Sequence, residues 1–189
     1  PVPATALGAL AGAVFNFTLA RRWIFRDHDG AAASQALRYA LVSGASLGEE
    51  GHLLSIEERI RESGIGPGRL AFEVTETTAV RDMMAAREWM RRLRDLGCRF
   101  ALDDFGIGFS SFSYLQSLPA DYVKIDGSFI RDLDTNLANQ ALVKAIDTVA
   151  HTLGKETIAE QVENLGSVAI LRELGVEFAQ GFALGGPKP

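Results

Sequence analysis

The feature that most constrains the fold is the alternation of strand-like and helix-like segments between residue 53 and the C-terminus. Short runs rich in β-branched and aromatic residues alternate with longer segments whose apolar residues recur every three or four positions. Strands that alternate with helices pair in parallel through crossover connections, so the pattern predicts an α/β fold. The expected strands cover about residues 69–73, 99–103, 122–125, 157–160 and 177–181.

Polar residues stand at the ends of these expected strands, and their position distinguishes two architectures. One is a doubly wound open sheet. The other is a barrel, in which the carboxyl ends of parallel strands converge on one face together with the catalytic groups. The pattern favours an incomplete TIM-type (β/α) barrel of about five βα units. The residues concerned are Glu73, Glu76, Asp103, Asp104, Lys124, Asp126, Glu160, Glu163 and Gln180.

Seven of these nine side chains are carboxylates, which indicates a site for divalent cations. Carboxylates that share one barrel mouth repel one another without cations, and Mg²⁺ or Mn²⁺ prefers oxygen ligands. Two such ions orient water and stabilise the oxygens of a phosphoryl displacement, so we expect metal-assisted phosphoester hydrolysis. The adjacent pair Asp103-Asp104 is the strongest signal, because it follows an apolar run. Any single acid here fits a helix cap or a solvated edge equally well.

Charge and cysteine content exclude several other classes of protein. The net charge is -5, and no basic stripe is present, so we expect no nucleic-acid polymer as a partner. Cys98 is the single cysteine, which excludes an intrachain disulfide and fits a reducing compartment. We therefore expect a cytoplasmic location for the part after residue 53. His28, His52 and His151 show no metal-ligand spacing and are expected on surfaces or at helix ends.

The N-terminal part has a different character. Residues 4–20 contain no charge and end at Arg21-Arg22-Trp23, as a membrane helix ends at its interface. We expect an apolar helical segment over residues 1–48 that anchors the chain to the inner membrane. A buried helix packed on the following domain is the alternative. Gly8 and Gly12 have the spacing that lets two membrane helices approach closely, so the sequence also leaves a homodimer open.

This N-terminal part resembles GtrA-like small membrane proteins. The resemblance rests on F-N-F-T-L-A-R-R-W-I-F-R from Phe15 and on Q-A-L-R-Y-A-L-V-S-G from Gln35. The second apolar stretch ends near Gly48, so the module is incomplete. The sequence thus divides into an N-terminal segment, 1–48, and a partial barrel, 53–189.

Five motifs of the second part resemble, in their order, the signature series of EAL domains, which hydrolyse the bacterial second messenger cyclic di-GMP. They are E-V-T-E from Glu73, D-D-F-G-x-G-F-S-S from Asp103, K-I-D from Lys124, E-Q-V-E from Glu160 and Q-G-F from Gln180. The resemblance implies Mg²⁺ or Mn²⁺ as cofactor, cyclic di-GMP as partner and substrate, and a linear dinucleotide as product.

The resemblance also implies a role for each matching residue. Glu73 and Asp103 would hold one metal, and Asp103 would bridge to a second metal. Asp104 and Glu160 would help to hold that second metal. Catalytic roles would fall to Glu160 and to Lys124, which resembles the lysine that contacts the attacking water or the phosphate. Supporting roles would fall to Asp126, Glu163, Gln180 and Glu76, the last of which steadies the loop over residues 103–111 in that family.

The sequence departs from the EAL pattern in several places. No E-x-L motif occurs in residues 1–52, and residues 43–46 offer no asparagine, so the first metal would lose two ligands. Ile107 replaces a small or hydroxyl residue, and Gln161 replaces a glycine. The strand that begins at Arg69 would present an unpaired edge.

Three interpretations of these departures remain open. The missing ligands could come from a neighbouring copy of the chain, or from Glu49 and Glu50. A degenerate module could bind cyclic di-GMP without hydrolysing it. A non-functional fusion of two incomplete parts would do neither. The sequence leaves open whether this chain is catalytically active.

Overall fold

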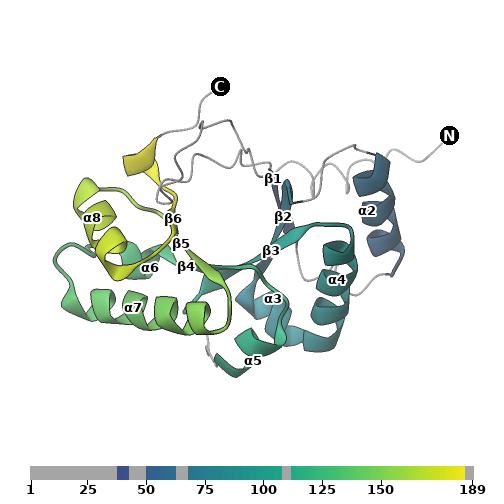
Figure 1. The fold of residues 1–189 in the computed structure, drawn as a ribbon, viewed down its shortest axis with the longest axis horizontal. Helices are drawn as coiled ribbons and strands as arrows, with labels where there is room; N and C mark the ends of the chain where they lie inside the picture. Colours follow the sequence, from purple (N-terminus) through teal and green to yellow (C-terminus); the bar gives the residue numbers. More distant parts are fainter. Residues whose placement is uncertain (1–37, 43–49, 63–67, 108–111, 186–189) are drawn as a thin grey trace.

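The computed structural model describes residues 38–42, 50–62, 68–107 and 112–185. In these residues six strands form one sheet in the order β1-β2-β3-β4-β5-β6, and every neighbouring pair is parallel. The strands lie along an arc, and the helices cover its outer side (Figure 1). The strands are β1 (Arg38–Val42), β2 (Leu70–Thr75), β3 (Arg99–Phe105), β4 (Tyr122–Ile125), β5 (Glu156–Ala159) and β6 (Phe178–Ala179).

At least one helix separates each pair of consecutive strands in the described residues, as the crossover connections of parallel strands require. A strand order that follows the chain order is that of a (β/α) barrel, whereas a doubly wound sheet reverses its order part-way. The α/β barrel-type prediction is therefore confirmed, and the doubly wound alternative is wrong. The helices are α2 (Glu50–Glu62), α3 (Glu76–Arg81), α4 (Met83–Asp95), α5 (Phe112–Ser117), α6 (Gly127–Ile130), α7 (Leu137–Thr152) and α8 (Leu165–Leu174), with a 3₁₀ turn at Phe182–Leu184.

The two faces of the sheet pack against different groups of apolar residues. On the outer face, the rings of Phe72 and Phe100 lie 5.4 and 5.5 Å from the ring of Trp89 on α4. A separate small cluster contains Ala71, Ala101, Tyr122 and Ile158, with Phe178 packed against it. Neighbouring residues such as Ala71 and Phe72 belong to different clusters, because successive side chains of a strand point to opposite faces.

All five expected strands are present, but the structure adds a sixth. β1 pairs with β2 in register from Arg38 opposite Leu70 to Val42 opposite Val74. Two expectations are therefore wrong: residues 38–42 are not helical, and the strand that begins near Arg69 is not an unpaired edge. The physical reason is that β1 satisfies the backbone hydrogen-bonding groups that an open edge would leave unpaired.

The rest of the expected N-terminal segment lies outside the described residues. This applies to the apolar run 4–20, to the G-x-x-x-G spacing and to the motif from Phe15, so the membrane anchor and the homodimer stay predictions. Among the helices that the structure describes, none combines the length and the apolar character needed to cross a membrane.

Candidate active site at the carboxyl ends of the strands

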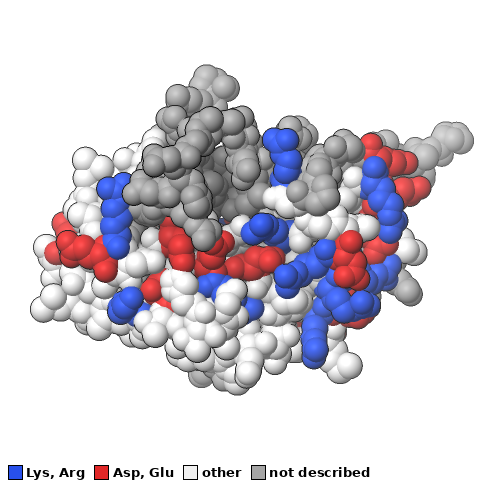
Figure 2. Space-filling view, viewed as in Figure 1, with Lys and Arg blue, Asp and Glu red and all other residues white. Residues whose placement is uncertain are grey.

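Four neighbouring strands bring the predicted residues together at their carboxyl ends. Glu73 lies on β2, Asp103 and Asp104 on β3, and Lys124 on β4, while Glu160 directly follows β5. Figure 2 shows acidic side chains gathered near the middle of the face that is viewed in Figure 1. The convergence expected from a parallel barrel is therefore present in the described part of the chain.

Lys124 lies at the centre of this group. Its ammonium nitrogen Nζ is 2.9 Å from Glu73 Oε1, 2.6 Å from Asp103 Oδ1 and 2.8 Å from Glu160 Oε1. The Lys124 side chain is only 4% exposed. A lysine so deeply buried needs charge partners, and it receives them from three different strands or strand ends.

The protonation behaviour of the group follows from burial and from this shared ion pair. Burial raises the pKa of Glu160 to about 7, against the opposing effect of Lys124 and with a contribution from Asp103. Burial also raises the pKa of Glu73, which Lys124 again opposes. For Lys124 itself, burial lowers the pKa, but the carboxylates of Glu160, Glu73 and Asp103 outweigh it and the pKa is raised. Lys124 is therefore protonated at neutral pH.

Asp103 and Asp104 reach the same site through an irregularity of β3. In a regular strand, adjacent side chains point to opposite faces. Here the register with β4 shifts between Leu102 and Phe105, and Asp104 has a φ of 56°, in the left-handed region that is strained for a residue with a side chain. Strain of this kind is concentrated at functional sites in proteins.

The acidic residues suit a divalent cation. Asp103, Asp104 and Glu160 each offer a carboxylate oxygen, and these oxygens lie within 4.8 Å of one another. All the donors are oxygens, which is the preference of Mg²⁺ and Mn²⁺. Burial raises the pKa of Asp104, and the neighbouring charge of Asp103 adds to the effect. Negative charge that is not fully balanced by protein groups is what a bound cation would compensate.

The remaining predicted site residues take up different positions. Gln180 follows β6, and its Nε2 donates a hydrogen bond to Glu160 Oε1. Glu76 is buried, and its Oε2 accepts a hydrogen bond from the backbone N–H of Gly106, 3.1 Å away. Asp126 caps α6 by accepting from Ser128 N at 2.8 Å.

Glu163 does not lie with the other acids. Its side chain is exposed, and it is not among the described residues that contact Lys124. Part of the loop that follows Asp103, residues 108–111, lies outside the described residues. The roles that the resemblance implied for Glu76, Asp126, Glu163 and Gln180 stay predictions.

Sequence reasoning missed two features close to the site. Strand β1 places Leu41 opposite Glu73, and its residues R-Y-A-L-V include no carboxylate and no amide side chain. Gln161 has a φ of 52°, and a Cβ atom on Gly127 would lie 2.5 Å from the Gln161 side chain. The replacement of a usual glycine by Gln161 was the available signal for the second feature.

Comparison with known proteins settles the family. The family model described as "EAL domain" matches residues 6–187. The chain belongs to the EAL domain family. Because this match begins at residue 6, it overlaps the segment compared above with GtrA-like proteins, and that second resemblance has no support.

Two relatives of this EAL chain are named as cyclic di-GMP phosphodiesterases. The first, PdeB of Shewanella oneidensis, is 46% identical over 148 residues, which make up 78% of this chain and 17% of the relative. The second, PdeF of Escherichia coli K12, is 33% identical over 159 residues, or 84% of this chain and 21% of the relative. The chain thus spans about a fifth of the length of these curated relatives.

Solved EAL structures have the same fold. The EAL domain of Mycobacterium smegmatis DcpA aligns with a TM-score of 0.74 at 35% identity, over 79% of this chain and 67% of that chain. The FimX EAL domain from Pseudomonas aeruginosa bound to c-di-GMP aligns with a TM-score of 0.74 at 30% identity, over 79% and 62%.

Proposed function

We propose that this EAL chain is a metal-dependent phosphodiesterase that hydrolyses cyclic di-GMP to the linear dinucleotide. The principal observation in support is the position of Lys124, whose ammonium contacts Glu73, Asp103 and Glu160 at the carboxyl ends of parallel strands. Two relatives that bear the name of this activity add support.

The chemistry assigns a task to each charged group. Glu73, Asp103, Asp104 and Glu160 would hold Mg²⁺ or Mn²⁺, which when bound orients water and neutralises charge on the phosphate. Lys124 is protonated, and an N–H released from one of its three carboxylate contacts would donate to a phosphate oxygen or to the attacking water as negative charge develops. Gln180 holds Glu160 by donating to its Oε1, so the carboxylate has one fixed oxygen.

Hydrolysis of cyclic di-GMP by the purified chain tests the proposal. With Mg²⁺ or Mn²⁺ the linear dinucleotide should appear by chromatography, and Glu160→Gln should lower the rate by about a hundredfold or more, as loss of a metal-holding carboxylate does. Glu88→Gln, on the exposed surface of α4, is the matched control and should leave the rate unchanged. A cooperatively folded chain that releases no linear product would overturn the proposal.

One observation favours a second function, binding of cyclic di-GMP without hydrolysis. Strand β1 lies beside β2 with Leu41 opposite Glu73, and its residues R-Y-A-L-V include no carboxylate and no amide, so among the described residues β1 adds no oxygen ligand of these kinds. Calorimetry with cyclic di-GMP in Ca²⁺ distinguishes the two functions. Binding with no product after exchange into Mg²⁺ or Mn²⁺ supports the second function, and the absence of binding rejects it.

A further inference from the structure

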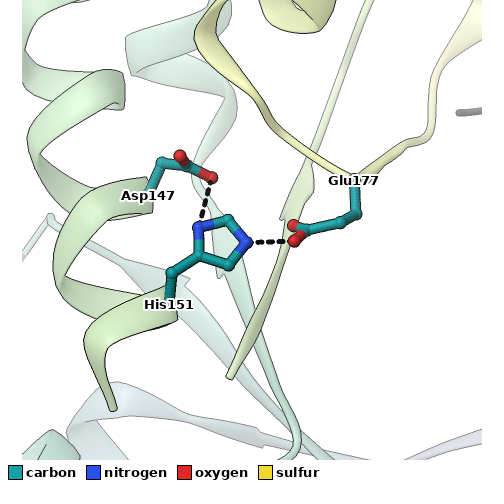
Figure 3. A group of neighbouring side chains, drawn as sticks. All are labelled: Asp147, His151 and Glu177. Carbon is teal, nitrogen blue, oxygen red and sulfur yellow. Dashed lines mark hydrogen bonds and ion pairs between the residues drawn. The ribbon is translucent and has the colours of Figure 1, made fainter. Parts of the chain in front are cut away.

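A second charged cluster lies at the opposite ends of β5 and β6 from the candidate active site. His151, near the C-terminus of α7, lies between Asp147 of the same helix and Glu177 just before β6 (Figure 3). His151 Nδ1 is 3.3 Å from Asp147 Oδ1, and Nε2 pairs with Glu177 Oε1. A neutral imidazole has one N–H, so a ring that faces a carboxylate with both nitrogens requires the doubly protonated form.

Thr157 connects this pair of carboxylates to β5. Its backbone N–H donates to Glu177 Oε2 at 3.0 Å, and its hydroxyl lies 2.7 Å from Asp147 Oδ1 and 3.1 Å from Glu177 Oε2. Thr157 is fully buried. We call Asp147, His151, Thr157 and Glu177 the His151 cluster. It joins α7, β5 and the start of β6.

Strand β6 is a short segment between Glu177 and Gln180. It consists of two residues, and it pairs with β5 only at Phe178 opposite Ile158 and Ala179 opposite Ala159. Gln180 follows at once and donates to Glu160. Backbone hydrogen bonds also hold this segment, from Gln180 N–H to Ala159 O at 2.8 Å and from Val162 N–H to Gln180 O at 3.0 Å. Only the two residues of β6 separate Glu177 from Gln180, so a shift at Glu177 would be passed to Gln180 along this short segment.

We propose that protonated His151 is a positioning residue, which holds Glu177 and thereby sets Gln180 against Glu160. The expected effect on turnover rests on the proposed function. The contacts from His151 through Glu177 to Gln180 can be tested without it. When His151 loses a proton, one ring nitrogen presents a lone pair to a carboxylate, and the contact becomes repulsive.

The charges that face His151 determine the direction of the pH effect. Burial lowers the pKa of His151, but the hydrogen bond to Glu177 and the charge of Asp147 outweigh it, so the pKa is raised above its ordinary value. Lys144 is a cation that pairs with Asp147, its Nζ 3.4 Å from Asp147 Oδ2. Burial raises the pKa of Glu177, but the bond from His151 reverses the shift, so that pKa is lowered. Between the lowered pKa of Glu177 and the raised pKa of His151, both groups are charged and the ion pair is formed. The pair is lost as pH rises through the raised pKa of His151.

The side chains of Asp147, His151 and Glu177 also offer a metal ion three donor atoms that lie within 4.8 Å of one another. A metal would need the lone pair of one ring nitrogen, and in the present arrangement each nitrogen faces a carboxylate oxygen instead. We therefore favour the protonated cluster, and a metal ion is an outcome that the experiment distinguishes.

Two measurements test the structural part on the full chain. The chain has three histidines, so the ring proton signal of His151 can be assigned by its loss in His151→Gln. The pKa obtained from this signal should lie above the ordinary histidine value of about 6.5, and Glu177→Gln should bring the pKa back toward that value. Hydrogen exchange at the Gln180 amide, which donates to Ala159 O, should be faster in both variants than in the wild type at pH 6 and alike in all three at pH 9.

The expected effect on turnover is a fall in kcat of up to about tenfold in His151→Gln at pH 6, with little change in KM and no difference at pH 9. Glu88→Gln is again the control. An ordinary pKa for His151 overturns the inference even if the chain hydrolyses cyclic di-GMP. Equal hydrogen-exchange rates at the Gln180 amide in the wild type and both variants at pH 6 overturn it as well. A His151 signal that one equivalent of Zn²⁺ shifts also overturns it, in favour of a metal site. A wild type without turnover refutes the proposed function alone, because titration and exchange still decide the structural part.

Discussion

At the scale of single residues, Lys124 determines the electrostatics of the candidate site. Three carboxylates, two on strands β2 and β3 and one directly after β5, contact one ammonium that is almost inaccessible to solvent. Removal of one member of a buried ion pair leaves charge that nothing compensates, which is far more destabilising than loss of a surface pair.

Lys124→Met should therefore lower the free energy of unfolding by about 3–5 kcal/mol without divalent ions, because Glu73, Asp103 and Glu160 lose their shared cation. Urea titration at pH 8 measures the change, and millimolar Mg²⁺ should restore part of it. Arg91→Met removes an exposed cation from α4 and should change stability by less than about 0.5 kcal/mol. Equal urea midpoints for the wild type and Lys124→Met would contradict the prediction.

Single-residue signals predicted which residues gather at the carboxyl ends of the strands, because strand ends and residue types are local properties. The position of the Asp104 side chain was harder to predict from the sequence. That its carboxylate joins that of Asp103 depends on a register shift against β4 and on a positive φ, and neither has a signal in the residues D-D-F-G. His151 was expected on a surface or at a helix end. Its partner Glu177 lies 26 residues further along the chain, so no local spacing could indicate the contact.

At the scale of elements, the short strand β6 and the turn after it determine where Gln180 lies. Gly181 has a φ of 156°, and a Cβ atom there would lie 2.3 Å from both the backbone N and O of Val162. The same backbone also holds the residue after β6, because Val162 N–H donates a hydrogen bond to Gln180 O at 3.0 Å. The turn therefore has no room for any side chain at position 181.

Gly181→Ala should displace the residues after β6 and reduce both stability and turnover. Gly154→Ala is the matched control, since Gly154 also has a positive φ, 71°, but a Cβ atom there meets nothing within 4 Å. We expect Gly154→Ala to lower the free energy of unfolding by roughly 1 kcal/mol through backbone strain, and Gly181→Ala to lower it by clearly more. Thermal unfolding of the two variants gives the comparison, and equal losses would show that the clash is relieved without consequence.

The His151 cluster links α7 to the β5–β6 edge, so stability should depend on pH through it. The folded-state pKa of His151 is raised, so its contribution is complete below the ordinary value of about 6.5 and is lost as pH rises through the raised pKa. The midpoint difference between wild type and His151→Gln should therefore be largest near pH 6 and vanish at high pH. Thermal unfolding between pH 6 and 9 measures it. A difference that grows with pH would have the wrong sign.

At the scale of the whole molecule, the described sheet has six sequential parallel strands, where a complete barrel has about eight. The five strands expected from periodicity are present. They could be predicted because strand and helix periodicities are recognisable within short segments of sequence. The sixth, β1, was missed because its five residues lie inside the stretch from Gln35 that resembles part of a membrane protein. Only its pairing with β2, from 32 positions along the chain, identifies it as a strand.

Divalent ions should stabilise the whole fold, because the acidic residues belong to β2, β3 and the end of β5. At a hundred times the dissociation constant, binding to the folded state alone adds about 2.7 kcal/mol. The melting temperature of the wild type should rise with Mg²⁺ or Mn²⁺ and fall again with EDTA. Glu160→Gln, which removes one ligand charge, should show a much smaller rise. An equal rise in both proteins would place the stabilising ion elsewhere.

The central position of Lys124 has a consequence for the order in which the working protein is assembled. Because the ammonium already gathers Glu73, Asp103 and Glu160, a newly synthesised chain can complete this sheet during a shortage of divalent ions. On the proposed function, metal supply would then control when the chain turns over substrate, while the sheet itself forms without the ion and gains further stability when the ion binds. Cells limited in magnesium or manganese would accumulate a folded, idle pool that responds as soon as the ion is restored.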